Sequence, residues 1–397
     1  MAKNANGEGS IYPWRKDGKP AGYKGALSYK DENGKTNRYV AYGRTRKIVK
    51  DKLEKARERV SAGAPVRDSK QTVGEWLAYW RATGLAASDR KESTRELYGR
   101  LSQKHLEPAP FGGIRLDQLR ASHIDALLLA MKGRTKPAKT DGGEARRAFS
   151  DSTIRQVYTV LRAGLDGAVR DGLVARNPAA MVTRPGVERH EARSLPAADV
   201  ARVLKQAEGS RYYPALALIA ATGLRRGEAL ALTWDKSIVN LDQGWLKVRK
   251  TLGRVNNRLD SSEPKTDRSR RTVPLSPAAV AVLRKHRAAQ AAEKLRAGNQ
   301  WRDSGLVFTS EFGGPVDPRN LLRVIEVAAK AAGVSGVGVH TLRHSVAVGW
   351  LESGVHIKAV ADLLGHSSIA ITGDVYGHTS DDTARKAIDG WSGALGL

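Results

Sequence analysis

The sequence of 397 residues contains no cysteine, so the chain forms no disulfides, uses no thiol nucleophile and binds no zinc through thiolates. Long apolar runs are also missing. The longest, from Tyr212 to Leu224, spans about 13 residues and contains a proline, whereas a helix that crosses a bilayer needs roughly 20 apolar residues. The N-terminal stretch MAKNANGEGS has no apolar segment of the kind found in signal peptides. These absences predict a cytoplasmic protein without a membrane partner.

Acidic residues are few relative to basic ones: 41 Asp and Glu face 67 Lys and Arg, which leaves a formal net charge of +26. The excess is +10 in residues 1–70, +6 in residues 71–192 and +10 in residues 193–397. A single basic tail would be typical of a disordered arm. Because every segment is basic, we expect several modules to contact one long polyanion, with nucleic acid the first candidate and an anionic membrane the second. A generally soluble basic protein is the plainer alternative.

The first module has the pattern of a small sheet followed by one helix. Residues 9–42 predict three short strands, with an Asp-Gly turn at 17–18 and an Asn-Gly turn at 33–34, and residues 45–61 predict a helix. In the second strand apolar residues alternate with basic and small ones, which predicts one basic face suited to a DNA groove. A module for solubility or protein docking is the alternative on this pattern alone.

A second module is predicted to consist of four helices. Two of them are expected behind the capping-box pairs Thr72 with Glu75 and Ser93 with Glu96, the third over 122–131 and the fourth over 152–170. Residues 132–150 are basic and lack periodicity, which predicts a loop. Polar stretches with Gly and Pro at 62–70 and 182–194 are the expected linkers on either side of this module.

The third module has a mixed and mostly helical pattern. Two segments, 245–249 and 271–275, alternate in hydropathy and predict strands of a hairpin or small sheet. The expected fold class is therefore multidomain. It combines a small three-stranded β-sheet plus a helix in residues 1–64, an all-α four-helix module in residues 72–183, and a mainly α, mixed α+β module in residues 193–397.

Four short stretches of the third module carry cationic side chains, and a tyrosine follows them. These residues are Arg225 with Glu228 in TGLRRGE, Lys265 in a Pro-Lys-Thr turn before a predicted strand, His340 and Arg343 in HTLR, His366 in LGHSS, and Tyr376. Each has an ordinary structural explanation when taken alone. Arg225 would pair with Glu228 at a helix start, and Lys265 would be one solvated lysine in a basic loop.

Taken together, these groups fit a phosphodiester that is being transferred. The transition state spreads negative charge over the non-bridging oxygens, which the paired N–H groups of Arg225 and Arg343 match. A histidine donates a further hydrogen bond or moves a proton near neutral pH, and a lysine can protonate the departing oxygen. A tyrosine supplies the nucleophile, and the same cations stabilise its oxyanion. Such a set requires no metal or other cofactor.

A zinc site is the competing chemical interpretation of His340 and His344, which are spaced by one helical turn. The glutamate that follows the first histidine of a zinc-binding helix is missing here, because position 341 is Thr. No acidic cluster lies nearby in the sequence. We therefore expect no metal at these histidines.

The order of these motifs resembles that of the tyrosine recombinase, or phage integrase, family. Residues 193–385 resemble its catalytic domain closely, and residues 72–180 resemble its helical core-binding domain more loosely. Residues 9–61 look like the N-terminal arm-binding domain of the longer, three-domain phage-type integrases. The tyrosine box ITGDVYGH departs from the expected pattern by a glycine before its aspartate, which concerns the local geometry and not the nucleophile.

The resemblance implies the roles of the four residues closest to the chemistry. Tyr376 would attack the scissile phosphate, which gives a 3′-phosphotyrosyl link and a free 5′-hydroxyl. Arg225 and Arg343 would hold the non-bridging oxygens. Lys265 would protonate the leaving 5′-oxygen. The function expected from this resemblance is that of a site-specific DNA recombinase that integrates or excises a phage or mobile element.

The resemblance also implies supporting residues and partners. His340 would assist proton transfer, His366 would donate a hydrogen bond to the phosphate, and Glu228 would position its neighbours. The implied partners are double-stranded DNA with core-type and arm-type attachment sites, and a homotetramer in the synaptic complex. A host DNA-bending protein and a directionality factor are the implied helpers, and the expected location is the cytoplasm of a bacterial host, on DNA.

Two other functions fit part of the sequence. A strand-nicking enzyme similar to type IB topoisomerases would share the chemistry, but it acts as a monomer without paired sites, and the arm-like first module argues against it. A non-catalytic DNA-binding regulator of the same fold is the other alternative. The intact set of six catalytic positions argues against such a regulator.

Overall fold

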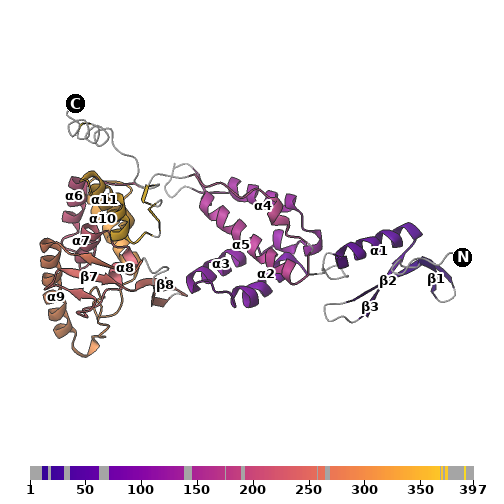
Figure 1. Ribbon diagram of the computed structural model, residues 1–397, viewed down its shortest axis with the longest axis horizontal. Helices are drawn as coiled ribbons and strands as arrows, with labels where there is room; N and C mark the ends of the chain where they lie inside the picture. Colours follow the sequence, from indigo (N-terminus) through magenta and orange to yellow (C-terminus); the bar gives the residue numbers. More distant parts are fainter. Residues whose placement is uncertain are drawn as a thin grey trace. The chain divides into compact units, whose positions relative to one another are not determined.

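The computed structural model covers three modules predicted from the sequence. The residues that it describes are 11–16, 19–30, 36–61, 71–137, 145–174, 176–188, 193–256, 258–263, 269–366, 368–369, 372–373 and 389. Contacts divide the chain into two compact units, Met1–Glu188 and Arg189–Leu397 (Figure 1). Among the described helices, none is both long and apolar enough to cross a membrane.

The N-terminal part of the first unit is an antiparallel sheet with one helix packed on it. Its strands are β1 (Ile11–Lys16), β2 (Lys19–Lys30) and β3 (Thr36–Gly43), paired in the order β1-β2-β3, and its helix is α1 (Arg46–Ser61). Leu27 of β2 is buried with Val49 and Leu53 of α1. The predicted strands and helix are confirmed, whereas the predicted turns at 17–18 and 33–34 lie outside the described residues.

The opposite face of this sheet carries aromatic and basic side chains. Lys24 lies opposite Tyr12 of β1 and Tyr42 of β3, and its ammonium is 5.6 Å from the centre of the Tyr42 ring. Tyr12 and Tyr42 are 40% and 43% exposed. Trp14 packs edge-on against Tyr42, with 4.8 Å between the ring centres. Because successive side chains of a strand point to opposite faces, the sheet has the apolar and basic faces that the alternation of β2 predicts.

The rest of the first unit is helical and has its own apolar core. The helices are α2 (Val73–Trp80), α3 (Glu92–His105), α4 (Ala121–Gly133) and α5 (Asp151–Arg170), with a π-helical turn at Arg81–Leu85 and 3-10 turns at Phe111–Gly113, Leu116–Gln118 and Pro178–Met181. Ile154, Val157 and Leu161 of α5 are fully buried on one stripe. Trp76 of α2 donates its indole N–H to the carbonyl of Gly164 at 2.8 Å, which joins α2 to α5.

Of the two predicted capping boxes, the first is confirmed and the second is wrong. The N–H of Glu75 donates to Thr72 Oγ1 at 3.2 Å, and the N–H of Thr72 donates to Glu75 Oε2 at 2.8 Å. The second helix starts earlier than its predicted cap at Ser93. The carbonyl of Lys91 already accepts the N–H of Arg95 at 3.0 Å, so Ser93 lies inside the helix.

Residues before α5, where a loop is predicted, form a short strand pair. Residues after α5, where a linker is predicted, begin by packing against that helix. Two short strands, β4 (Thr135–Lys136) and β5 (Arg146–Arg147), form an antiparallel ladder. Residues 138–144 of the predicted loop lie outside the described part. Arg147 pairs with Asp151 at the start of α5, with 2.7 Å between Nη2 and Oδ1. After α5, the Tyr158 hydroxyl donates to the carbonyl of Val182 at 3.1 Å, so the predicted linker begins on the surface of α5.

The second unit is mainly helical. Its helices are α6 (Ala197–Ala207), α7 (Tyr213–Thr222), α8 (Arg226–Leu230), α9 (Pro277–Ala297), α10 (Pro318–Ala331), α11 (Val339–Glu352) and α12 (Ile357–Leu364), with a 3-10 turn at Gly298–Gln300. Leu216 and Ile219 of α7 are fully buried in one core with Leu342 of α11 and Leu246. The motif TGLRRGE begins at the last residue of α7 and therefore lies next to this core.

A small sheet and a hairpin complete the second unit. The strands are β6 (Val239–Asn240), β7 (Trp245–Val248), β8 (Thr251–Val255), β9 (Arg258–Ser262) and β10 (Arg271–Pro274). The sheet order β10-β7-β6 pairs Arg271 with Val248 and confirms the two predicted strands. The hairpin of β8 and β9 is not predicted, because half of its residues are exposed, only one is buried, and the pattern shows no clear alternation. Asn256, with φ of 48°, is the turn signal that marks it.

We expect Gly164→Val to destabilise the helical module by about 1–3 kcal/mol, because overpacking of a filled core has this effect. A Cβ at Gly164 would overlap Leu77 Cδ2. Urea unfolding followed by tryptophan fluorescence measures the change, since Trp76 and Trp80 are buried beside this position. Gly133→Val is the matched control, because a Cβ there meets nothing within 4 Å. Equal unfolding midpoints for the two variants would contradict this packing.

Candidate active site

The motif TGLRRGE follows α7 through a turn that only glycine fits. Gly223 has φ of 65°, and a Cβ at this position would lie 2.6 Å from Leu364 Cδ2. The turn places Arg225 just before α8. There its N–H donates to Glu228 Oε2 at 2.9 Å, and its Nη1 donates to Glu228 Oε1 at 2.8 Å. The pairing of Arg225 with Glu228 at a helix start is thus present, and Arg225 makes further contacts beyond it.

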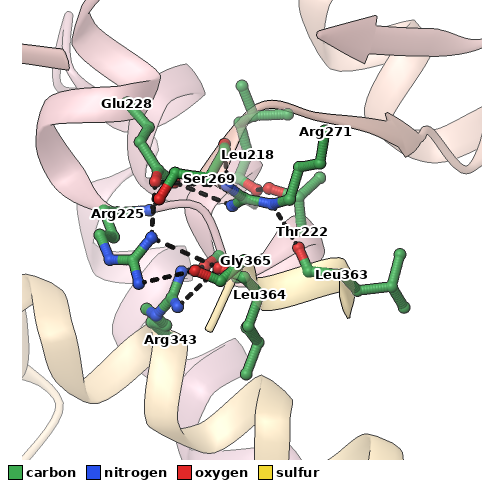
Figure 2. Close-up of polar contacts among 11 residues, drawn as sticks. Leu218, Thr222, Arg225, Glu228, Ser269, Arg271, Arg343, Leu363, Leu364 and Gly365 are labelled. Carbon is green, nitrogen blue, oxygen red and sulfur yellow. Dashed lines mark hydrogen bonds and ion pairs between the residues drawn. The ribbon is translucent and has the colours of Figure 1, made fainter. Parts of the chain in front are cut away.

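Arg343 reaches the same point from α11. It is 4% exposed, and it donates from Nη1 to the carbonyl of Gly223 and from Nη2 to the carbonyl of Leu364 at 2.8 Å. Arg225 Nη2 donates to the carbonyl of Gly365 at 3.1 Å. Figure 2 shows both guanidinium groups directed at the carbonyl oxygens where α12 ends. Because the last carbonyls of a helix carry partial negative charge, they hold two cations at one place.

A third arginine, to which the sequence assigns no function, completes this cluster. Arg271 at the start of β10 donates from Nη2 to Glu228 Oε2 at 2.9 Å. It also donates from Nε to the carbonyl of Leu363 at 2.6 Å and from Nη1 to the carbonyl of Ser269 at 3.2 Å. The signal for its burial is weak: Arg271 shares a strand face with the buried Val273. Nothing local to β10 indicates that its partner is a glutamate of α8.

The carboxylate of Glu228 is shared by two arginines. Burial disfavours its charged form, but the hydrogen bonds and positive charges of Arg271 and Arg225 outweigh burial and hold the pKa of Glu228 below its ordinary value. Glu228 is therefore ionised at neutral pH. With Arg343 added, three positive charges face one negative charge, so the cluster as a whole attracts anions.

Three histidines lie near these arginines. His340 and His344 belong to α11, and His366 follows α12. Burial, followed by nearby positive charges, lowers the pKa of all three, that of His366 to about 4. His366 Nδ1 lies 2.8 Å from the hydroxyl of Thr372. We infer that these imidazoles are neutral at pH 7 and gain protons more readily when a negative charge arrives.

The structure brings five of the seven predicted site residues into this region, namely Arg225, Glu228, His340, Arg343 and His366. The other two, Lys265 and Tyr376, lie outside the described residues. In the part of the chain that the structure describes, no group of three His, Cys, Asp or Glu side chains is placed to hold a metal ion. The assembled side chains are donors for an oxyanion.

Comparisons with known proteins agree with this chemistry. The sequence pattern of the phage integrase family matches residues 191–383. An integrase of Streptomyces ambofaciens is 30% identical over 361 residues, which cover 87% of this chain and 86% of that protein. A XerC-like tyrosine recombinase of Caldanaerobacter subterraneus is 28% identical over 378 residues, which cover 91% of this chain and 93% of that protein.

Solved structures share the fold. The Tn1549 transposon integrase in complex with transposon right end DNA has a TM-score of 0.62 at 20% identity and covers 80% of this chain and 99% of its own. The lambda integrase tetramer bound to a Holliday junction has a TM-score of 0.57 at 20% identity and covers 96% of this chain and 99% of its own.

These relatives define the class of this protein as a DNA strand transferase of the tyrosine type. The chain belongs to the phage integrase family and is a tyrosine site-specific recombinase. This confirms the function expected from the motif order, and it does not favour a topoisomerase-like enzyme or a non-catalytic regulator.

We expect the second unit to lose stability as the pH falls, because the folded pKa of His366, about 4, lies below its ordinary value of 6.5. Between these values the unfolded chain binds a proton at this histidine that the folded chain does not. After a discount for partial exposure, the loss is about 1–2 kcal/mol. Melting temperatures at about pH 7 and about pH 5 should differ less for His366→Gln than for wild type.

His356→Asn is the control for this measurement, because His356 is exposed and Asn retains an acceptor at the start of α12. It should show the wild-type change with pH. A His366→Gln variant with an undiminished change would mean that His366 is not the group responsible.

Proposed function

We propose that this recombinase inserts or excises a phage or other mobile element by exchanging DNA strands through a covalent link at Tyr376. The observation that carries the proposal is the convergence of Arg225 and Arg343 at the end of α12. The Arg225 side chain is 37% exposed, so a phosphate has access to it. Two planar cations in place before DNA arrives stabilise the negative charge of the transition state without rearrangement.

In the proposed reaction the Tyr376 oxygen attacks the scissile phosphorus. A bond from phosphorus to the tyrosine oxygen forms, and the bond to the 5′-oxygen breaks. Lys265 gives a proton to that oxygen, and the 5′-hydroxyl of a partner strand later reverses the step and restores the tyrosine. Because the ester link keeps the energy of the phosphodiester, no nucleotide cofactor is consumed.

The remaining residues are proposed to support this exchange. Arg225 and Arg343 hold the non-bridging oxygens, and His366 donates a hydrogen bond to the phosphate. His340 assists proton transfer, because the charge of the bound phosphate raises the pKa of a neighbouring imidazole. Glu228 positions Arg225 and does not react.

All three predicted modules are proposed to contact DNA: residues 1–64, 72–183 and 193–397. Separate apolar cores around Leu27, Leu161 and Ile219 support this division. We propose that the second and third modules both bind core-type DNA and that the chain acts as a homotetramer. The fold that it shares with the lambda integrase tetramer on a Holliday junction supports this assembly.

The sheet of the first module is proposed to bind arm-type DNA. Its exposed face carries Tyr12, Lys24 and Tyr42, which suit a groove lined by phosphates and base edges. Where an arm site and a core site lie on one duplex, bending of the DNA between them would bring both to one chain, and duplex DNA is stiff over about 150 base pairs. We therefore include a host DNA-bending protein and a directionality factor as helpers, in the cytoplasm of a bacterial host.

We expect Tyr376→Phe to form no covalent complex, because a phenyl ring has no nucleophilic oxygen. The assay uses a nicked suicide duplex with a candidate core site taken from DNA beside the coding region. Wild type should be trapped in a denaturant-stable complex. Both proteins should bind the duplex in gel shifts, with affinity that falls steeply as salt rises.

Tyr213→Phe is the matched control, because Tyr213 lies in α7 and has no proposed role in the chemistry. It should be trapped at the wild-type rate. A covalent complex of Tyr376→Phe, or a wild-type protein that is never trapped, would contradict the proposed reaction.

The double variant Lys24→Ala, Tyr42→Ala should lose arm-type DNA and keep core-type DNA. Wild type should enrich two unrelated motifs from a random duplex pool, and this variant should enrich one of them. Lys50→Ala is the control, since Lys50 is an exposed lysine of α1. Retention of both motifs by the double variant would exclude this sheet face as the second DNA site.

A further inference from the structure

The buried carboxylate of Glu228 has two arginine partners that differ in exposure. Arg271 Nη2 lies 2.9 Å from Oε2 and its Nη1 lies 3.3 Å from Oε1, so this guanidinium spans both oxygens. Arg225 contacts one of them with its side chain, Oε1 at 2.8 Å. The Arg271 side chain is 7% exposed, against 37% for Arg225. Arg271 is thus the interior partner, and Arg225 is the partner that is accessible from the surface.

Arg271 is held in this place by the backbone as well. Its Nε donates to the carbonyl of Leu363 and its Nη1 to that of Ser269, so it joins the start of β10 to the end of α12. Gly365 leaves room for it, because a Cβ there would lie 2.7 Å from Arg271 Nη1. Figure 2 shows the guanidinium groups of Arg271 and Arg225 reaching the same carboxylate of Glu228 from different segments of the chain. No step of the proposed reaction uses Arg271, yet one carboxylate and two backbone carbonyls accept its hydrogen bonds and a glycine leaves space for it.

The charges show what this arrangement does. If Glu228 had Arg225 as its only cation, the pair would be neutral and the guanidinium would be drawn toward the carboxylate. Arg271 supplies a second positive charge, and its two contacts satisfy both carboxylate oxygens. Arg225 then stays hydrogen-bonded to the carboxylate, which orients its guanidinium group. The positive charge of Arg225 remains available to a phosphate.

We propose that Arg271 is a positioning residue that neutralises Glu228 and thereby leaves the positive charge of Arg225 for the scissile phosphate. The inference rests on the proposed function, because it takes Arg225 as a phosphate-binding residue. It adds a residue that acts on Arg225 through Glu228.

The test is a double-mutant cycle of Arg271→Met and Glu228→Gln, read as the single-turnover rate of covalent trapping on the suicide duplex. Arg271→Met alone should slow trapping about 100-fold, as loss of one preorganised donor does. In the Glu228→Gln background the same substitution should slow it less than about tenfold, because an amide has no charge to neutralise. A role of Arg271 that is independent of Glu228 would give the same loss in both backgrounds.

Conservative and matched variants separate this effect from a loss of folding. Arg271→Lys keeps the charge and should be trapped faster than Arg271→Met. Arg211→Met is the matched control, because Arg211 forms a similar partly buried pair with Glu293, at 2.6 Å, elsewhere in the same unit. It should be trapped at the wild-type rate. Melting temperatures and gel shifts show which variants are folded and bound.

Each outcome decides the proposal. If Arg271→Met does not fold, the double variant is compared with Glu228→Gln, since replacing both partners of a buried pair is tolerated better than removing one. A double variant more than about tenfold slower than Glu228→Gln overturns the proposal. The proposal is also overturned if Arg271→Lys is trapped no faster than Arg271→Met. This comparison of the two Arg271 variants decides the proposal when Glu228→Gln is trapped too slowly for its rate to be compared. A wild type that is never trapped overturns the proposed function instead.

Discussion

One buried carboxylate organises the catalytic unit. Glu228 is 4% exposed, and a charge so deeply buried is stable only when it is paired and hydrogen-bonded. Its partners Arg225 and Arg271 come from segments up to 43 residues away, and Arg271 in turn reaches the end of α12. Removing one partner of such a group typically destabilises a protein by about 3–5 kcal/mol. The position of the surface guanidinium therefore depends on contacts in the interior.

Backbone carbonyls also hold the arginines of this cluster in place. Three arginines close together would repel one another, and one carboxylate offsets only part of their charge. The last carbonyls of α12 accept hydrogen bonds from Arg225 and Arg343, and the carbonyl of Gly223 accepts another. These acceptors hold the cations in place in the free protein. Burial, followed by these positive charges, lowers the pKa of the nearby histidines His340 and His366. The negative charge of a bound phosphate acts in the opposite direction and raises the pKa of an imidazole beside it.

Periodicity and turn signals predict the elements in which local pattern and burial agree. The sheet of the first module, helix α5 and the strands β7 and β10 each bury one face, so their apolar residues repeat at the spacing of the element. The predictions that fail concern elements in which the local pattern and the burial do not agree. Ser93 looks like a cap but lies inside α3, and the hairpin of β8 and β9 is too exposed to alternate. Short pairings such as β4 with β5 depend on the neighbouring helix, here through the ion pair at the start of α5.

The sequence by itself determined which chemical groups this protein has and in what order. Six positions, Arg225, Lys265, His340, Arg343, His366 and Tyr376, carry residue types that suit a phosphodiester, and their order resembles that of the phage integrase family. Only the tertiary structure decided how these groups are charged and held. The role of Arg271 and the neutral state of His366 arise from burial and from partners distant in the chain. Local sequence patterns do not reveal such contacts. The spacing of a residue predicts which face of a helix or strand it lies on, but not which distant group contacts that face.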